Sequence, residues 1–124
     1  MKLDEECVRD ILFVTEKYSN FDFPIRDTTY FNELKQKYNQ QKILYHIRQC
    51  DLSGLIYGFN KDFEGLFVKD LTPSGHNFLG HIRKDENWRK TKEIARKVGA
   101  TSLDVFIKVA SNFVSDLISK QFDR

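Results

Sequence analysis

The stretch Asn39–Ile56 constrains the fold most, because it combines a helix start, a helix stop and the beginning of a strand. Asn39 is a good N-cap, since its side-chain oxygen can accept hydrogen bonds from amides of the first turn. Helical spacing then gives one apolar face, made by Ile43, Ile47 and Cys50. Gly54 can adopt the left-handed conformation that ends a helix, and the apolar residues after it favour a strand. The pattern predicts a short helix that leads directly into a β-ribbon.

The composition fits one small globular chain. Hydrophobic residues make up 40% and charged residues 31% of the 124 residues, and eleven phenylalanines supply core material. A chain of this length buries roughly two-thirds of its unfolded surface, so it can fold without disulfides or a metal ion. These proportions exclude a wholly disordered chain.

The charge balance is mildly basic. The net charge is +2 and the isoelectric point about 8.5, well short of the strongly basic footprint of a dedicated nucleic-acid binder. Acidic residues gather at the start of the first predicted helix, and basic residues in Lys84–Lys97. This asymmetry indicates either opposite surfaces or two ordinary solvated helix faces.

The two cysteines and the N-terminus indicate the cellular compartment in which the protein is expected. Cys7 and Cys50 fall on predicted apolar helix faces, where reduced, buried thiols are expected, with a disulfide as the alternative. The acidic N-terminus lacks the pattern of a signal peptide, and no run reaches the ~20 apolar residues of a membrane span. We therefore expect a cytoplasmic protein.

The order of predicted elements suggests the architecture. The periodicities predict a helix over Asp4–Tyr18, a strand in Phe21–Arg26, a helix over Tyr30–Lys37 capped by Thr28 or Thr29, the helix after Asn39, strands in Leu55–Phe59 and Leu66–Leu71 around a loop at Asn60–Gly65, and helices over Pro73–Arg83, Glu86–Val98 and from Thr101 or Ser102 onward. This predicts an α+β, mostly α fold. Residues 1–83 would form a winged helix-turn-helix with a small antiparallel β-wing. Residues 84–124 would form a C-terminal helical extension, packed on that domain or forming a dimer interface.

Several short motifs resemble a known family. They are Tyr45-His46-Ile47-Arg48, Gly54-Leu55-Ile56, Asp70-Leu71-Thr72 with Gly75-His76 and Phe78-Leu79, and Ile82-Arg83 with Trp88. Together they resemble a family of small bacterial and phage proteins, a domain of unknown function regarded as winged-helix-like. The chain departs from that pattern at Pro73-Ser74 and in a longer, more basic insert before the helix that follows Asn39. The resemblance implies a fold and a phage or mobile-element origin, and no catalytic residues.

The outer face of the helix after Asn39 is the first candidate site. Gln and Arg can make bidentate hydrogen bonds to purine edges in the major groove, and Lys and Tyr can hold phosphates. The predicted DNA-binding residues are Gln40, Gln41, Lys42, Tyr45, His46 and Arg48, with Lys61 and Lys69 from the wing. The alternative is a solvated face on a protein-binding winged helix. Phe63 in the wing loop either folds back or marks a partner contact.

The last predicted helix carries a sustained apolar stripe. Its predicted dimer-interface residues are Phe106, Phe113, Val114, Leu117 and Ile118. The alternative is that this stripe packs against other helices of the same protomer. We expect a homodimer.

No motif for catalysis, cofactor binding or metal binding is recognisable. His76 and His81 are five residues apart, which puts them on different helical faces, and the cysteines do not form a metal-binding pair. We therefore expect a protein that is not an enzyme and carries no cofactor or metal. The leading hypothesis is a phage or prophage transcriptional regulator that binds double-stranded DNA. The alternative is a protein-interaction adapter or inhibitor from a mobile genetic element.

Overall fold

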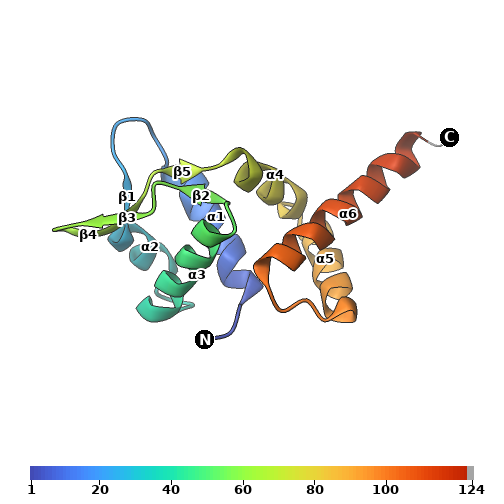
Figure 1. Ribbon diagram of the computed structural model, residues 1–124, viewed down its shortest axis with the longest axis horizontal. Coiled ribbons are helices and arrows are strands. Elements are labelled where there is room, and N and C mark those ends of the chain that lie inside the picture. Colours follow the sequence, from blue (N-terminus) through green and yellow to red (C-terminus); the bar gives the residue numbers. More distant parts are fainter. Residues whose placement is uncertain (123–124) are drawn as a thin grey trace. The chain divides into compact units, whose positions relative to one another are not determined.

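The computed structural model describes residues 1–122 (Figure 1). These residues form a mostly helical α+β structure with six α-helices and small antiparallel sheets, in agreement with the predicted fold class. The chain divides into two compact units, which meet between His76 and Asn77, inside a helix. No helix among these residues is long and apolar enough to cross a membrane.

The elements follow one another with short connections. Their bounds are α1 Glu5–Tyr18, β1 Ile25–Arg26, α2 Asp27–Leu34, α3 Gln40–Leu52, β2 Ile56–Tyr57, β3 Asn60–Asp62, β4 Gly65–Val68, β5 Asp70–Leu71, α4 Pro73–Ile82, α5 Asp85–Val98 and α6 Leu103–Phe122.

Helix α1 begins where the sequence predicts. The Asp4 side chain accepts hydrogen bonds from the amides of Glu6 and Cys7, which fixes the N-terminus. One face of the helix is buried, and α1 packs against α3. The buried face includes Cys7, Val8, Ile11 and Leu12. Cys7 and Cys50 are both buried and both free.

The segment between α1 and α2 differs from the prediction. Only Ile25–Arg26 of the predicted strand pairs, because the Asn20 side chain accepts hydrogen bonds from the amides of Asp22 and Phe23 and folds the preceding residues into a turn. Helix α2 starts at Asp27, so Thr28 and Thr29 lie inside it and do not cap it. It also ends at Leu34, short of the predicted Lys37.

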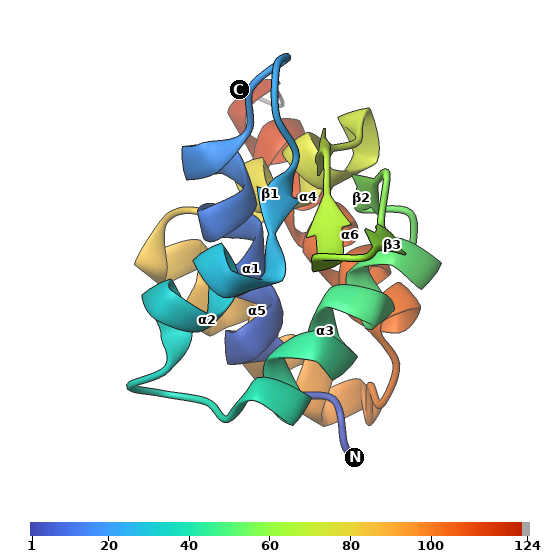
Figure 2. The same cartoon turned by 90° about the vertical axis from the view of Figure 1, so that its left-hand side faces the viewer.

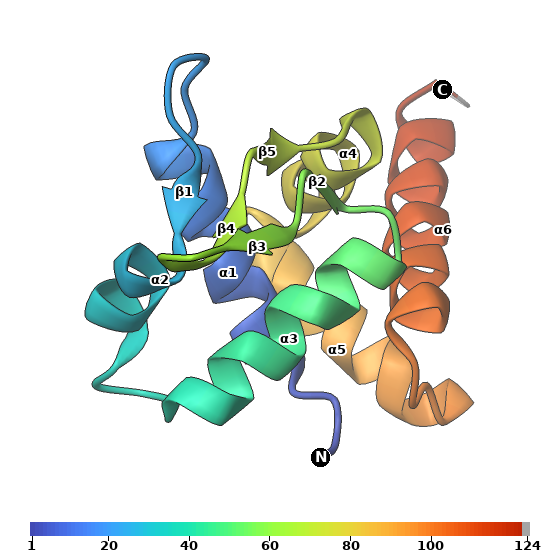
Figure 3. The same ribbon diagram turned by 60° about the vertical axis from the view of Figure 1, so that its left-hand side comes forward.

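The predicted hairpin is present and longer than expected. Most of the loop predicted at Asn60–Gly65 is strand, because β3 pairs with β4 and leaves only Phe63 and Glu64 at the tip. β4 pairs with β1 on its other side, so the strand order is β1-β4-β3 (Figure 3). At the base, β2 pairs with β5. This connectivity is compatible with a winged helix.

The first unit closes at the start of α4. The Thr72 hydroxyl accepts a hydrogen bond from the Gly75 amide, so Thr72 caps α4, and Pro73 is its first residue, as the sequence predicts. A Cβ atom at Gly75 would lie 2.0 Å from the Leu55 carbonyl oxygen. Glycine at this position therefore permits a backbone contact between α4 and the segment that enters β2.

The second unit is built around an aromatic cluster. The Phe106 ring lies 5.4 Å from the Trp88 ring and 6.4 Å from the Phe78 ring, and all three are buried. Gly99, with a φ of 69°, ends α5 in the left-handed conformation. Val98, in the last turn of α5, is exposed.

Candidate nucleic-acid interface

The outer face of α3 has the local structure that the sequence predicts. The Asn39 side chain accepts a hydrogen bond of 2.9 Å from the Lys42 amide and so caps the helix. The apolar face of Ile43, Ile47 and Cys50 is buried. Of the predicted DNA-binding residues of α3, Gln40, Gln41 and Arg48 are exposed, and Tyr45 is half-buried.

His46 does not belong to this face. Its side chain is fully buried, its Nε2 accepts a 2.8 Å hydrogen bond from the Asp4 amide, and its Nδ1 lies 2.8 Å from the Lys42 carbonyl oxygen. Because Nε2 accepts, Nδ1 must carry the proton and donate, which defines the neutral tautomer. Burial lowers the pKa of His46 below its ordinary value.

The sequence prediction that His46 contacts DNA is therefore wrong, since a fully buried ring with both nitrogens bonded to main-chain atoms cannot reach a groove. A sequence signal for this placement exists. His46 is three residues after Ile43 and four before Cys50, which puts it on the buried stripe.

Lys42 is neutralised within the protein. Its Nζ lies 2.7 Å from the Asp4 carboxylate and 5.4 Å from the centre of the Tyr38 ring. Partial burial tends to raise the pKa of Asp4, but the bonds from Lys42 and from the Cys7 and Glu6 amides outweigh it, so that pKa lies below its ordinary value. In turn, the hydrogen bond to Asp4 raises the pKa of Lys42. The first turns of α3 consequently present little free positive charge.

The hairpin tip is also close to neutral. Arg26, on β1, lies 2.8 Å from the Asp62 carboxylate and 3.4 Å from that of Glu64. Its guanidinium stands 5.2 Å from the centre of the Phe67 ring. Lys61 is exposed on β3 beside this arrangement. The charges of Arg26 and Lys61 therefore balance those of the two carboxylates.

Phe63, at the tip of the hairpin, remains in solvent. Its side chain is 96% exposed, so it does not fold back onto the sheet. The prediction that Phe63 folds back is therefore wrong, and a contact with a partner stays a prediction.

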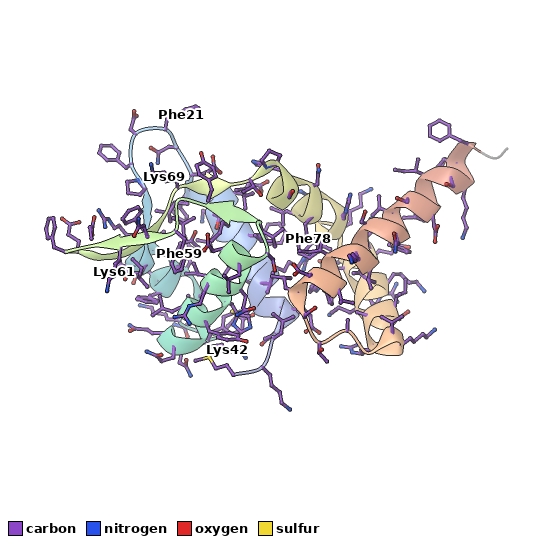
Figure 4. All side chains as sticks on the ribbon, in the orientation of Figure 1. Phe21, Lys42, Phe59, Lys61, Lys69 and Phe78 are labelled. Atoms are coloured by element: carbon purple, nitrogen blue, oxygen red, sulfur yellow. The ribbon has the colours of Figure 1, made fainter. Side chains whose placement is uncertain are left out.

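The predicted basic residues do not form one cluster. Figure 4 places Lys42 on α3, Lys61 on the hairpin and Lys69 beneath the loop before β1. The aliphatic part of Lys69 covers Gly58, where a Cβ atom would lie 2.5 Å from the Lys69 Cγ. Among residues 1–122, Arg48, Lys61 and Lys69 form no ion pair. The surface formed by α3 and the hairpin therefore has two free cations, Arg48 and Lys61.

Two residues that shape this surface were missed by sequence reasoning. Asp4 pairs with Lys42, and Arg26 pairs with both carboxylates of the hairpin tip. Asp4 and Lys42 are 38 positions apart and Arg26 and Asp62 are 36 apart, so no local spacing indicates either pair. The only sequence signal for the pairing of Arg26 was the excess of acidic over basic residues at the hairpin tip.

Nothing in the described range resembles a metal centre. Residues 1–122 contain no group of three or more His, Cys, Asp or Glu side chains placed to hold a metal ion. Burial raises the pKa of the Cys7 thiol to about 12 and also raises the pKa of Cys50. Both thiols therefore stay protonated and unreactive near neutral pH.

The residues of the predicted dimer stripe on α6 differ in their exposure. Phe106 is wrongly included, because it is buried in the aromatic cluster of its own unit. Phe113 and Val114 are half-buried, and Leu117 and Ile118 are exposed. Phe122, which the sequence reasoning did not include, is 82% exposed on the last turn.

The fold and this surface define a small, mostly helical α+β protein in which a helix with one exposed face is followed by an antiparallel hairpin. The chain belongs to the family described as "Hypothetical protein (DUF2513)", whose model matches residues 2–101. This confirms the resemblance to an uncharacterised family. The match includes α1 to α5 and ends before α6. Searches of the curated proteins and of the solved structures found no match.

Proposed function

We propose that the chain is a winged-helix protein that binds double-stranded DNA, with α3 as its recognition helix, and that it acts as a phage or prophage transcriptional regulator. The observation that carries the proposal is the pairing of α3, whose Gln40, Gln41 and Arg48 are exposed, with a hairpin that carries an unpaired Lys61. Glutamine and arginine can read purine edges, and lysine can bind phosphates. The strand order β1-β4-β3 supports the same class.

The internal ion pairs limit the strength of this binding. Lys42 and Arg26 are already paired with carboxylates, which leaves Arg48 and Lys61 as free cations on the surface. Each phosphate contact contributes about −0.9 to the slope of log affinity against log salt, so two contacts give a slope of about −2. Binding is then weak and best detected at low ionic strength.

Fluorescence anisotropy with a labelled random duplex at low salt tests the proposal. We expect saturable binding that Arg48→Ala weakens by several-fold, because it removes one of the two free cations. Gln41→Ala removes no charge, so it should weaken binding to a random duplex less. Lys108→Ala removes an exposed cation from α6 and serves as the matched control. No binding by the wild-type protein, or equal binding by Arg48→Ala and Lys108→Ala, would contradict the proposal.

A protein-interaction adapter or inhibitor is the second candidate. It is favoured by the near-neutral hairpin tip, which offers phosphates little net positive charge, and by Phe63, an aromatic side chain left in solvent there. A protein that shows no electrophoretic shift with random duplex, yet whose hairpin is protected on binding a partner, would support this function over the first.

We also propose that the exposed end of α6 pairs with a second copy of the chain. Leu117, Ile118 and Phe122 are exposed over the last turns, and Phe113 and Val114 are half-buried beside them. Asp116 and Lys120 on the same helix can form ion pairs when two such helices align antiparallel. Light scattering over a concentration series tests this, and a monomer mass at every concentration would contradict it.

A further inference from the structure

A pocket of about 570 Å³ lies in the first unit, away from the outer face of α3. The loop of residues 19–24, between α1 and β1, forms one wall. Tyr57, Lys69 and Asp70, from the β2–β5 ribbon and its connection, form the other. The volume falls in the range of small-molecule and side-chain pockets.

The loop wall is held in a fixed conformation. The Asn20 Oδ1 accepts hydrogen bonds from the amides of Asp22, at 2.9 Å, and Phe23, at 3.0 Å. The Asn20 amide group also donates to the Tyr18 carbonyl oxygen at 3.3 Å. Figure 2 shows the result as a narrow arch that stands clear of α1. The pocket wall is thus organised before any ligand arrives.

Aromatic side chains stand in solvent around this pocket. Phe21 is fully exposed, Phe23 is 74% exposed and Tyr57 is 48% exposed. Phe21 lies at the top of the arch and Lys69 beneath it (Figure 4). Aromatic residues grouped in this way at a concave surface are typical of interaction sites, because their apolar area gains free energy when a partner covers it.

The charges of the lining favour a cation. Asp22 and Asp70 contribute two negative charges and Lys69 one positive charge. Within residues 1–122, Asp22 and Lys69 form no ion pair. One Asp70 carboxylate oxygen accepts the Leu71 amide at 2.6 Å, and the other has no hydrogen bond in the described chain. Negative oxygens and aromatic rings therefore lie at the same pocket.

We propose that this pocket binds an arginine side chain of a protein partner. A guanidinium is planar, so it can stack on an aromatic ring while it donates to carboxylate oxygens. Lysine provides the charge without the planar stacking. An anion would meet two carboxylates, and an apolar side chain would desolvate them without replacing their hydrogen bonds to water. The proposal does not depend on DNA binding.

A titration of the isotope-labelled full chain with capped Gly-Arg-Gly, followed by amide chemical shifts, tests the proposal. We expect saturable shifts confined to residues 19–24 and to Tyr57, Lys69 and Asp70. The same peptide with lysine should bind about two- to fivefold more weakly, which corresponds to the stacking contribution. Peptides with norleucine or glutamate in the central position should produce no saturable shift.

Variants then separate this pocket from general surface effects. Phe21→Ala and Asp22→Asn should each weaken the arginine peptide by about fivefold. Leu52→Ala and Asp104→Asn are the controls, because each changes an exposed apolar or acidic residue elsewhere and should leave the affinity unchanged. All four positions are exposed, so the fold should tolerate each substitution.

Three results would overturn the inference. The first is an arginine peptide that shifts no pocket amide. The second is equal binding of the norleucine peptide, which would identify a general apolar groove. The third is a pocket shifted by duplex DNA that the arginine peptide does not displace, which would make this wall part of a nucleic-acid surface. DNA binding through α3 would remain possible after the first two results.

Discussion

Two buried threonines, one in each unit, differ in whether their hydroxyl groups have hydrogen-bond partners. The Thr15 hydroxyl, on α1, donates to the Ile11 carbonyl oxygen at 2.8 Å and lies 2.8 Å from the Tyr30 hydroxyl. The Thr91 hydroxyl, on α5, is buried without a hydrogen-bond partner in the described part of the chain. A buried polar group without a partner is destabilising, whereas a bonded one also fixes which segments meet.

The two units also differ in how far the apolar side chains of their helices are buried. In the first unit the isoleucines of α3 are buried between α1, α2 and the ribbon, as the near-complete burial of Ile47 shows. In the second unit α6 starts with buried residues and ends with exposed ones, and Ile118 is 52% exposed. The isoleucines of α3 are therefore covered within the first unit, while the end of α6 leaves apolar surface available to a partner.

The largest expected effect comes from a matched pair of isoleucines. Ile47→Ala should lower the free energy of unfolding by about 2–5 kcal/mol, because it leaves a cavity between α3 and its neighbours. Ile118→Ala should change it by less than about 0.5 kcal/mol in a dilute monomer. Urea denaturation at two protein concentrations measures both. A large loss for Ile118→Ala at the lower concentration would show that the end of α6 is already covered within one chain.

His46 gives the next effect, through pH. Because burial lowers its folded pKa below the ordinary value of 6.5, the neutral ring stabilises the fold above pH 6.5, and this contribution is lost as pH falls below 6.5 toward the folded pKa. His46→Gln should destabilise the protein by about 1–3 kcal/mol at pH 8, since the glutamine side chain has a different shape and cannot keep the hydrogen bonds of both ring nitrogens, to the Asp4 amide and the Lys42 carbonyl oxygen. It should also flatten the decline of stability below pH 6.5.

His81→Gln gives the corresponding pH effect in the second unit, for comparison with His46→Gln in the first. Burial also lowers the pKa of His81, so it contributes to the acid decline in the same direction. His81 is only partly buried, and its substitution should remove a smaller part of the pH dependence. Thermal unfolding across this pH range measures both variants, and an unchanged profile for His46→Gln would contradict the assigned hydrogen bonds.

Substitution of the two buried threonines gives the smallest effect and directly tests whether their hydroxyl groups differ in hydrogen bonding. Thr15→Val should lower the free energy of unfolding by about 1 kcal/mol or more, because the Tyr30 hydroxyl loses its buried partner. Thr91→Val should be neutral or stabilising, since it replaces an unbonded hydroxyl with a methyl group. Equal losses for the two variants in urea denaturation would remove the distinction between the units.

Much of the local structure could be predicted because its causes lie within a few residues. Asp4, Asn39 and Thr72 cap helices through amides two or three positions ahead, and each is recognisable from its residue type and position. Gly54 and Gly99 adopt positive φ where the apolar periodicity stops. The predicted helix and hairpin after Asn39 are confirmed for this reason.

The errors lie where a distant segment intervenes. The Asp27 carboxylate accepts a hydrogen bond from the Leu66 amide, thirty-nine positions away, and α2 begins at Asp27 and not at the threonines that follow. The spacing of His46 with Ile43 and Cys50 indicates a buried position, but its partner, the Asp4 amide, lies forty-two positions away and no residue pattern reveals it.

By itself the sequence determined most of the helices, the caps at Asn39 and Thr72, and the hairpin, because helix periodicity, capping and turn chemistry act over a few residues. Only the tertiary structure decided which charges remain free on the surface. Ion pairs such as Lys42 with Asp4 and Arg26 with Asp62 join segments more than thirty residues apart, and they form only when folding brings those segments together.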